Sequence, residues 1–197
     1  MRHRIGVESL LLAVGIACFP IYVLPSGNIQ PAHALLAGFA ILVLVRQGLP
    51  FNVWMLLMSA MFIHVLFVEI FYFFILRQEP QLKPAAFWFY NILFTSAIYW
   101  HVLKWPLGTV KVGVLCAASL AVTTVLASGV QLDSSGPTQR AVGTFNNPNQ
   151  LGYFSVCLLS LTYLLSREGK LGPVITVALY SVSVFLAIAS LSKAAML

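Results

Sequence analysis

Apolar residues run along this chain in long stretches that do not alternate with polar ones. A helix rises about 1.5 Å per residue, so roughly 20 apolar residues cross the hydrocarbon core of a bilayer. The stretches therefore predict seven membrane-spanning helices, separated by turns rich in Pro and Gly. Their expected bounds are Val7–Leu24, Ile29–Val45, Phe51–Leu76, Ala85–Leu103, Leu107–Val130, Pro148–Ser166 and Leu171–Leu191.

Composition supports the same class of protein. The 197 residues are 60% hydrophobic and only 8% charged, whereas soluble domains carry about 25% charged residues. The mean hydropathy is +0.92. We therefore expect an all-α fold, a polytopic transmembrane helix bundle of about seven spans, with residues 1–197 forming a single integral membrane domain in contact with the lipid bilayer.

The distribution of basic residues predicts the orientation in the membrane. With a cytoplasmic N-terminus, seven of the eleven Lys and Arg residues lie on the inner side, namely Arg2, Arg4, Arg46, Lys104, Lys111, Arg167 and Lys170. The outer side then holds Arg77, Lys83, Arg140 and Lys193. Cytoplasmic loops are normally the richer in Lys and Arg, so loop 132–147 is expected outside. The enrichment of Lys and Arg in cytoplasmic loops explains the net charge of +6. The charge therefore does not indicate a nucleic-acid partner, and none is expected.

The stretch "RAVGTFNNPNQLGYF", residues 140–154, is unusually polar for this chain. Asn147 precedes a proline, which predicts that it caps a helix starting at Pro148, and Gln150 is placed to return a capping-box bond. A helix start attracts phosphate, and the guanidinium of Arg140 can bind phosphate in a bidentate fork. Ordinary capping explains the same Asn-Pro pair, and that alternative stays open.

Glu69 is a further candidate because a carboxylate inside a membrane is costly and is often functional. It is expected in the outer half of the third span, where it can meet Arg140 or Lys193. A protonated or interfacial glutamate without a function is the alternative. His33 and His101 lie near the ends of spans and are expected at the interface. The cysteines occur without CxxC spacing, so no zinc site or disulfide framework is indicated.

The polar stretch and the end of the chain together resemble the O-antigen ligase and O-antigen polymerase-like family of bacterial inner-membrane proteins. The matching residues are Arg140, Gly143, Phe145, Asn147, Pro148, Asn149, Gly152 and Ser192. Lys193 stands where the family usually has arginine, and lysine lacks the planar fork. The resemblance covers residues 140–197.

The resemblance implies transfer of a glycan from an undecaprenyl-diphosphate carrier on the periplasmic face of the bacterial inner membrane. The acceptor would be lipid A-core, another glycan chain or a protein hydroxyl, and neither a metal nor another cofactor is expected. Arg140 would stabilise the leaving diphosphate, Glu69 is a second catalytic candidate, and Asn147, Asn149, Gln150 and Lys193 would bind substrate. Family members are larger, so the chain is expected to be the N-terminal part of such a protein.

Two other classes of function stay open. One is a channel or transporter, because "NPN" at a helix start is similar to the Asn-Pro-Ala boxes of aquaporins. Those proteins need two copies on inverted half-helices, and Asn147-Pro148-Asn149 occurs once. The other is a structural membrane subunit without catalytic activity.

Overall fold

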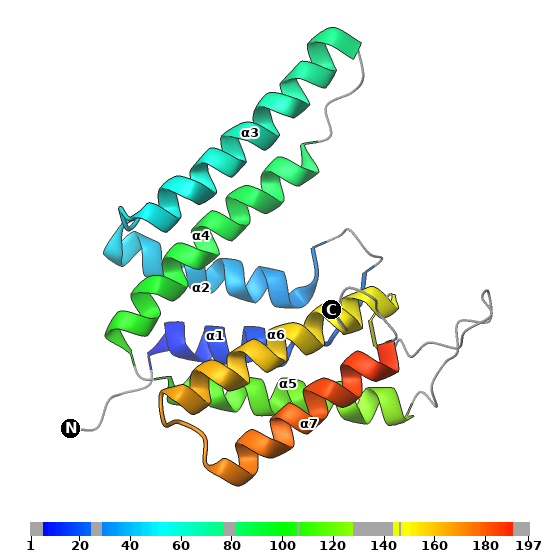
Figure 1. Ribbon diagram of the computed structural model, residues 1–197. Coiled ribbons are helices and arrows are strands. Elements are labelled where there is room, and N and C mark those ends of the chain that lie inside the picture. The colour runs from blue at the N-terminus through cyan, green and yellow to red at the C-terminus, as the bar shows by residue number, and fades with distance from the viewer. Residues whose placement is uncertain are drawn as a thin grey trace, which may run out of the picture. The chain divides into compact units, whose positions relative to one another are not determined.

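The computed structural model describes residues 6–24, 29–76, 82–105, 107–127, 144–145 and 147–190. These residues form helices and no strand, so the expected all-α fold is confirmed (Figure 1). The helices are α1 (Val7–Ala17), α2 (Pro31–Gln47), α3 (Val53–Leu76), α4 (Lys83–Lys104), α5 (Gly108–Ala127), α6 (Pro148–Arg167) and α7 (Pro173–Ser190). Each of them overlaps one of the seven predicted apolar stretches.

The first stretch departs from its prediction. It was expected to be helical through Leu24, but α1 ends at Ala17. Pro20 explains the early end, because proline has no N–H to donate and its ring clashes with the preceding turn of a helix. The 11 residues of α1 extend about 16 Å at 1.5 Å per residue, which is too short to cross a hydrocarbon core of about 30 Å.

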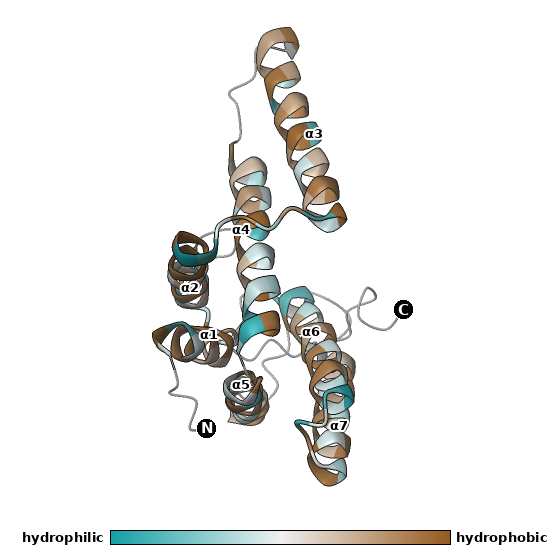
Figure 2. Ribbon diagram, turned by 90° about the vertical axis from the view of Figure 1, so that its left-hand side faces the viewer, coloured by the Kyte–Doolittle hydropathy of each residue, from teal (hydrophilic) through white to brown (hydrophobic). Residues whose placement is uncertain are grey.

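Three of the described helices, α3, α5 and α7, are long and apolar enough to cross a membrane. Apolar residues also make up most of α3 in Figure 2, and most of its large apolar side chains are exposed. A helix that exposes apolar side chains along its length is stable in hydrocarbon rather than in water. The three helices thus have the length and the apolar surface of membrane-spanning helices.

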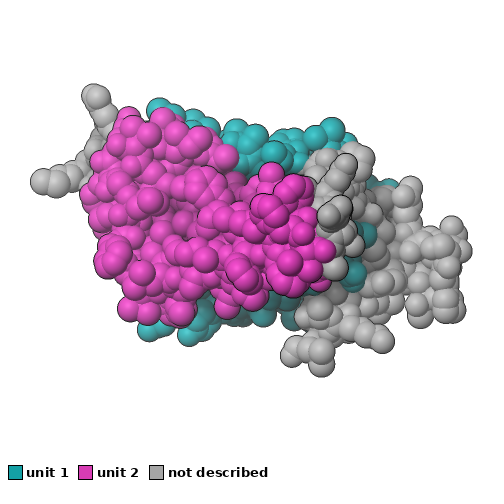
Figure 3. Space-filling model, turned by 90° about the horizontal axis from the view of Figure 1, so that it is seen from above, with its two compact units in different colours: residues 1–36, 106–197 teal, residues 37–105 magenta. Residues whose placement is uncertain are grey.

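The chain divides into two compact units, coloured separately in Figure 3. The first unit comprises residues 1–36 and 106–197, and the second comprises residues 37–105. The boundary falls inside α2. The single integral membrane domain expected from the sequence stays a prediction.

In the first unit, α1 packs along α5, and α6 packs against α7 (Figure 1). The contact between α1 and α5 is very close, because a Cβ added at Gly113 would lie 2.6 Å from the carbonyl oxygen of Ala13. Gly113, Ala117 and Ala121 are all buried and recur every four residues on α5. Small residues at this spacing let membrane helices approach closely, and at Gly113 this stripe lies directly against α1.

In the second unit, α3 and α4 form a helical hairpin (Figure 1). The side-chain oxygen of Asn52 accepts a hydrogen bond of 2.9 Å from the Met55 amide, which caps the start of α3. The indole of Trp100 on α4 donates to the Gly48 carbonyl oxygen at 2.9 Å. This bond ties α4 to the end of α2, where Gly48 takes a positive φ of 73°.

Candidate functional site

The start of α6 carries three of the residues singled out from the sequence. Asn147 has extended backbone angles, and its side-chain oxygen accepts a hydrogen bond of 3.0 Å from the Gln150 amide. Pro148 follows as the first helical residue. The predicted N-cap is therefore confirmed, while the return bond from the Gln150 side chain stays a prediction.

The same cap limits what the backbone can offer an anion. Pro148 has no N–H, and the N–H of Gln150 is already bonded to Asn147. Two of the first three helical positions therefore provide no backbone donor, so side chains have to supply most of any interaction with phosphate. The side chain of Asn149 is exposed, and those of Asn147 and Gln150 are partly exposed. The structure thus brings three side-chain amides together on one helical turn.

The remaining candidates are Arg140, Lys193 and Glu69. Arg140 and Lys193 lie outside the described residues. Glu69 is a partly exposed residue of α3 and belongs to the second unit. Its expected proximity to Arg140 or Lys193 stays a prediction.

An aromatic cluster supports the start of α6. It consists of Phe19, Tyr22, His33, Phe145 and Phe154. The ring centroid of Phe145 lies 5.2 Å from that of Tyr22 and 5.4 Å from that of Phe154. Phe19 stacks on Phe154 at 6.4 Å and meets His33 edge to face at 6.2 Å. Because Phe145 is only 3% exposed, this cluster fixes the residue two positions before the Asn147 cap.

The segment that follows α1 is held in place by one buried side chain. The side-chain oxygen of Gln30 accepts hydrogen bonds from the amides of Val23 and Leu24, both at 3.1 Å. Its side-chain nitrogen donates to the Leu24 carbonyl oxygen at 2.7 Å. Gln30 therefore satisfies backbone groups that a longer α1 would have bonded internally. The hydroxyl of Thr144 also donates to the Pro20 carbonyl oxygen, which links this segment to the entry of α6.

Comparison with protein-family models, curated proteins and solved structures found no match. The O-antigen ligase and polymerase-like assignment therefore rests on the motif residues, and it stays a prediction. Within the described ranges, no three His, Cys, Asp or Glu side chains lie together in a way that could hold a metal ion.

Residues 18–24 and Gln30 were not among the residues predicted from the sequence to support the site. Two signals were available: Pro20 interrupts the first apolar stretch, and proline is a recognised helix stop. Gln30 is a polar residue at the entry of the second stretch. Neither signal reveals that the segment lies against Phe145, because that contact joins residues far apart in the sequence.

His101 was expected at the membrane interface, and that depth stays a prediction. Its side chain is fully buried, stacked on Trp105 with ring centroids 5.5 Å apart and edge to face with Phe39 at 5.6 Å. Neither ring nitrogen has a hydrogen-bond partner in the described part of the chain. The position near a helix end suggested contact with water, but the two aromatic neighbours exclude it.

Replacing His101 by phenylalanine is expected to stabilise the protein by about 1 kcal/mol, because a buried polar atom without a partner costs about 1–3 kcal/mol. The ring contacts with Phe39 and Trp105 are retained. The measurement is the midpoint of thermal unfolding in detergent. His64→Phe is the control, since His64 is exposed on α3 of the same unit and should show little change. A lower midpoint for His101→Phe would mean that the imidazole is hydrogen-bonded in solution.

Proposed function

We propose that this chain is a glycan ligase or polymerase-like membrane protein of the inner membrane of bacteria. It transfers a glycan from an undecaprenyl-diphosphate carrier to an acceptor hydroxyl on the periplasmic face. One observation supports this proposal most strongly: the amides of Asn147, Asn149 and Gln150 share one turn whose entry is fixed by the buried ring of Phe145. Amide side chains at a rigid helix start suit the recognition of phosphate and sugar oxygens.

In this proposal the acceptor hydroxyl attacks the anomeric carbon of the carried glycan. The bond between that carbon and the diphosphate oxygen breaks, and undecaprenyl diphosphate leaves. Because the Asn147 cap already occupies the Gln150 amide, Arg140 supplies most of the charge that stabilises the leaving group. Five positions separate Arg140 from Phe145, a spacing that allows its side chain to reach the start of α6. Glu69 is the proposed acceptor of the hydroxyl proton, and Lys193 a further phosphate ligand.

Asn147→Asp separates the capping role from the binding role. Aspartate caps helices about as well as asparagine and suits the positive end of the helix dipole, so the unfolding midpoint should be unchanged. A carboxylate would, however, repel the diphosphate. We therefore expect glycan transfer to fall at least about tenfold, which corresponds to about 1.4 kcal/mol, in a membrane assay with an undecaprenyl-diphosphate-linked donor.

Asn52→Asp is the matched control, because Asn52 caps α3 with the same geometry and should leave transfer unchanged. If the Asn147→Asp variant transferred glycan at the full rate, the start of α6 would not belong to the site. Full transfer by the Arg140→Ala variant would show that Arg140 does not belong to it. Reporter tags that placed residues 132–147 in the cytosol would contradict the proposal as a whole.

A further inference from the structure

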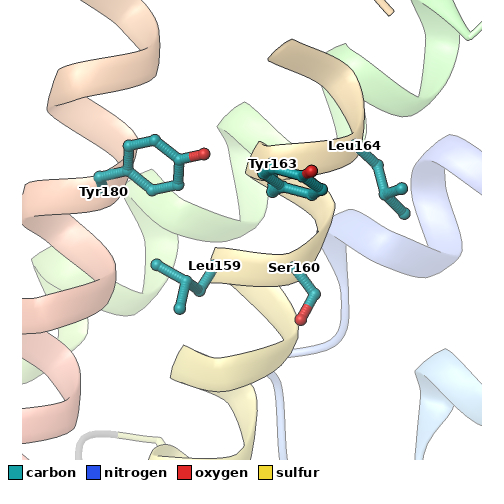
Figure 4. A pocket seen from close by; sticks show the side chains of 5 residues that line it. All are labelled: Leu159, Ser160, Tyr163, Leu164 and Tyr180. Carbon is teal, nitrogen blue, oxygen red and sulfur yellow. The ribbon is translucent and has the colours of Figure 1, made fainter. Parts of the chain in front are cut away.

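An open groove of about 510 Å³ lies on the α6–α7 hairpin. Its lining residues are Leu159, Ser160, Tyr163, Leu164 and Tyr180. Figure 4 shows the ring of Tyr180 extending from α7 towards α6, with Tyr163 and Leu159 facing it. The groove is therefore mostly apolar, with two phenolic hydroxyls at its edge, and its volume is that of an ordinary small-molecule site of about 300–1,000 Å³.

The groove lies near the end of the hairpin where its two helices are joined. At about 1.5 Å per residue, Tyr163 is about 6 Å from Arg167 at the end of α6, and Tyr180 is about 10 Å from Pro173 at the start of α7. In a membrane-spanning orientation, the 18 residues of α7 extend about 27 Å, close to the thickness of the hydrocarbon core. The turn that joins the helices then lies at the boundary between hydrocarbon and headgroups, and the groove lies in the hydrocarbon just inside it.

The turn beside the groove has a well-defined geometry. Gly169 has a positive φ of 65°, its amide donates to the Ser166 carbonyl oxygen at 2.9 Å, and the Lys170 amide donates to the Leu165 carbonyl oxygen at 2.9 Å. These two bonds form a Schellman motif. The Thr176 hydroxyl lies 3.4 Å from that of Ser166, which also joins the two helices here.

The charges of the turn are predominantly positive. Arg167, Glu168 and Lys170 are exposed, and the positive end of the α7 dipole begins directly after them. Arg167 follows Tyr163 by four positions, so it lies on the same face of α6 as the groove. Two exposed cationic residues and a helix start thus lie at the turn next to the apolar groove.

We propose that this groove binds an anionic phospholipid. One acyl chain lies along Leu159 between the two tyrosines, and the phosphate is held by Arg167, Lys170 and the start of α7. Basic pockets between membrane helices on the cytoplasmic side are recognised sites for acidic lipid headgroups, and the turn is on the predicted cytoplasmic side. The inference depends on the membrane position of the hairpin and not on glycan transfer.

The experiment measures phosphatidylglycerol and phosphatidylcholine binding to the purified chain in detergent, by native mass spectrometry and by the shift of the unfolding midpoint. We expect phosphatidylglycerol to bind at least about tenfold more tightly. The double variant Arg167→Gln/Lys170→Gln should remove this preference, because it removes the phosphate ligands. Leu159→Trp should weaken binding of both lipids by filling the groove while retaining the charges.

Lys104→Gln/Lys111→Gln is the control, since it removes the same charge elsewhere and should preserve the preference. Equal binding of the two lipids by the unaltered chain would overturn the proposal. So would an equal loss in the control variant, which would indicate attraction by net charge alone. The chain could instead form a dimer that added lipid does not dissociate and that the Leu159→Trp substitution abolishes. That result would overturn the proposal and assign the groove to a second copy of the chain.

Discussion

Phe145→Ala is expected to lower the free energy of unfolding by about 3–5 kcal/mol, the usual cost of truncating a buried phenylalanine. The side chain is 3% exposed, and its ring contacts Tyr22 and Phe154. Its removal leaves a cavity between the segment that follows α1 and the first turns of α6. The same ring fixes the entry to the Asn147 cap, so the proposed glycan transfer should be lost together with stability.

The measurement is the unfolding midpoint in detergent, together with hydrogen exchange of residues 18–24. Exchange should increase there, because the segment loses the aromatic surface against which it packs. Tyr153→Ala is the matched control: Tyr153 is the neighbour of Phe154 on α6 but is 59% exposed, so its truncation should change the midpoint little. An unchanged midpoint for Phe145→Ala would mean that the aromatic cluster does not hold the start of α6.

Gly113→Leu is expected to cost about 3 kcal/mol, at the upper end of the usual cost of overpacking, and to separate α1 from α5. A Cβ at this position would lie 2.6 Å from the Ala13 carbonyl oxygen and 3.1 Å from the Ala13 Cα. Both are backbone atoms, so no rotation of a side chain can relieve the clash. Leucine is a better helix former than glycine by nearly 1 kcal/mol, and the local effect alone would therefore stabilise α5.

Gly38→Leu provides the control for this substitution. Gly38 lies inside α2, and a Cβ added there would meet no atom within 4 Å. The same change should therefore leave the unfolding midpoint unchanged or raise it. If Gly113→Leu were tolerated as well as Gly38→Leu, the close contact between α1 and α5 would not be present in the folded protein.

The sequence predicted correctly those features that depend on residues close together in the chain. The Asn147 cap depends only on the Asn147 side chain, on Pro148 and on the backbone amide of Gln150, which lie within four positions. The hydrogen bond between the Gln150 amide and the Asn147 side chain is present. The seven helical segments follow from the lengths of the apolar stretches. Pro20 marks where the same reasoning failed, because α1 ends before it while the hydropathy of the stretch continues through Leu24.

The burial of His101 shows the limit of such reasoning. Its place near the end of a span predicted contact with the interface, yet Phe39 and Trp105 enclose the ring. The side-chain contacts of a residue in a helix bundle depend on which faces of other helices pack against it. Hydropathy does not specify those faces when every side of a helix is apolar.

By itself, then, the sequence determined the all-α class, the presence of helices long and apolar enough to cross a membrane, and the capped start of α6, since length, hydropathy and capping act within one helix. Only the tertiary structure decided that Gly113 lies against Ala13, that Gln30 bonds the segment after α1, and that Phe145 joins Phe154 and Tyr22. Those contacts join distant parts of the chain, and close packing of complementary side chains selects them. No local pattern of apolar and polar residues encodes that complementarity.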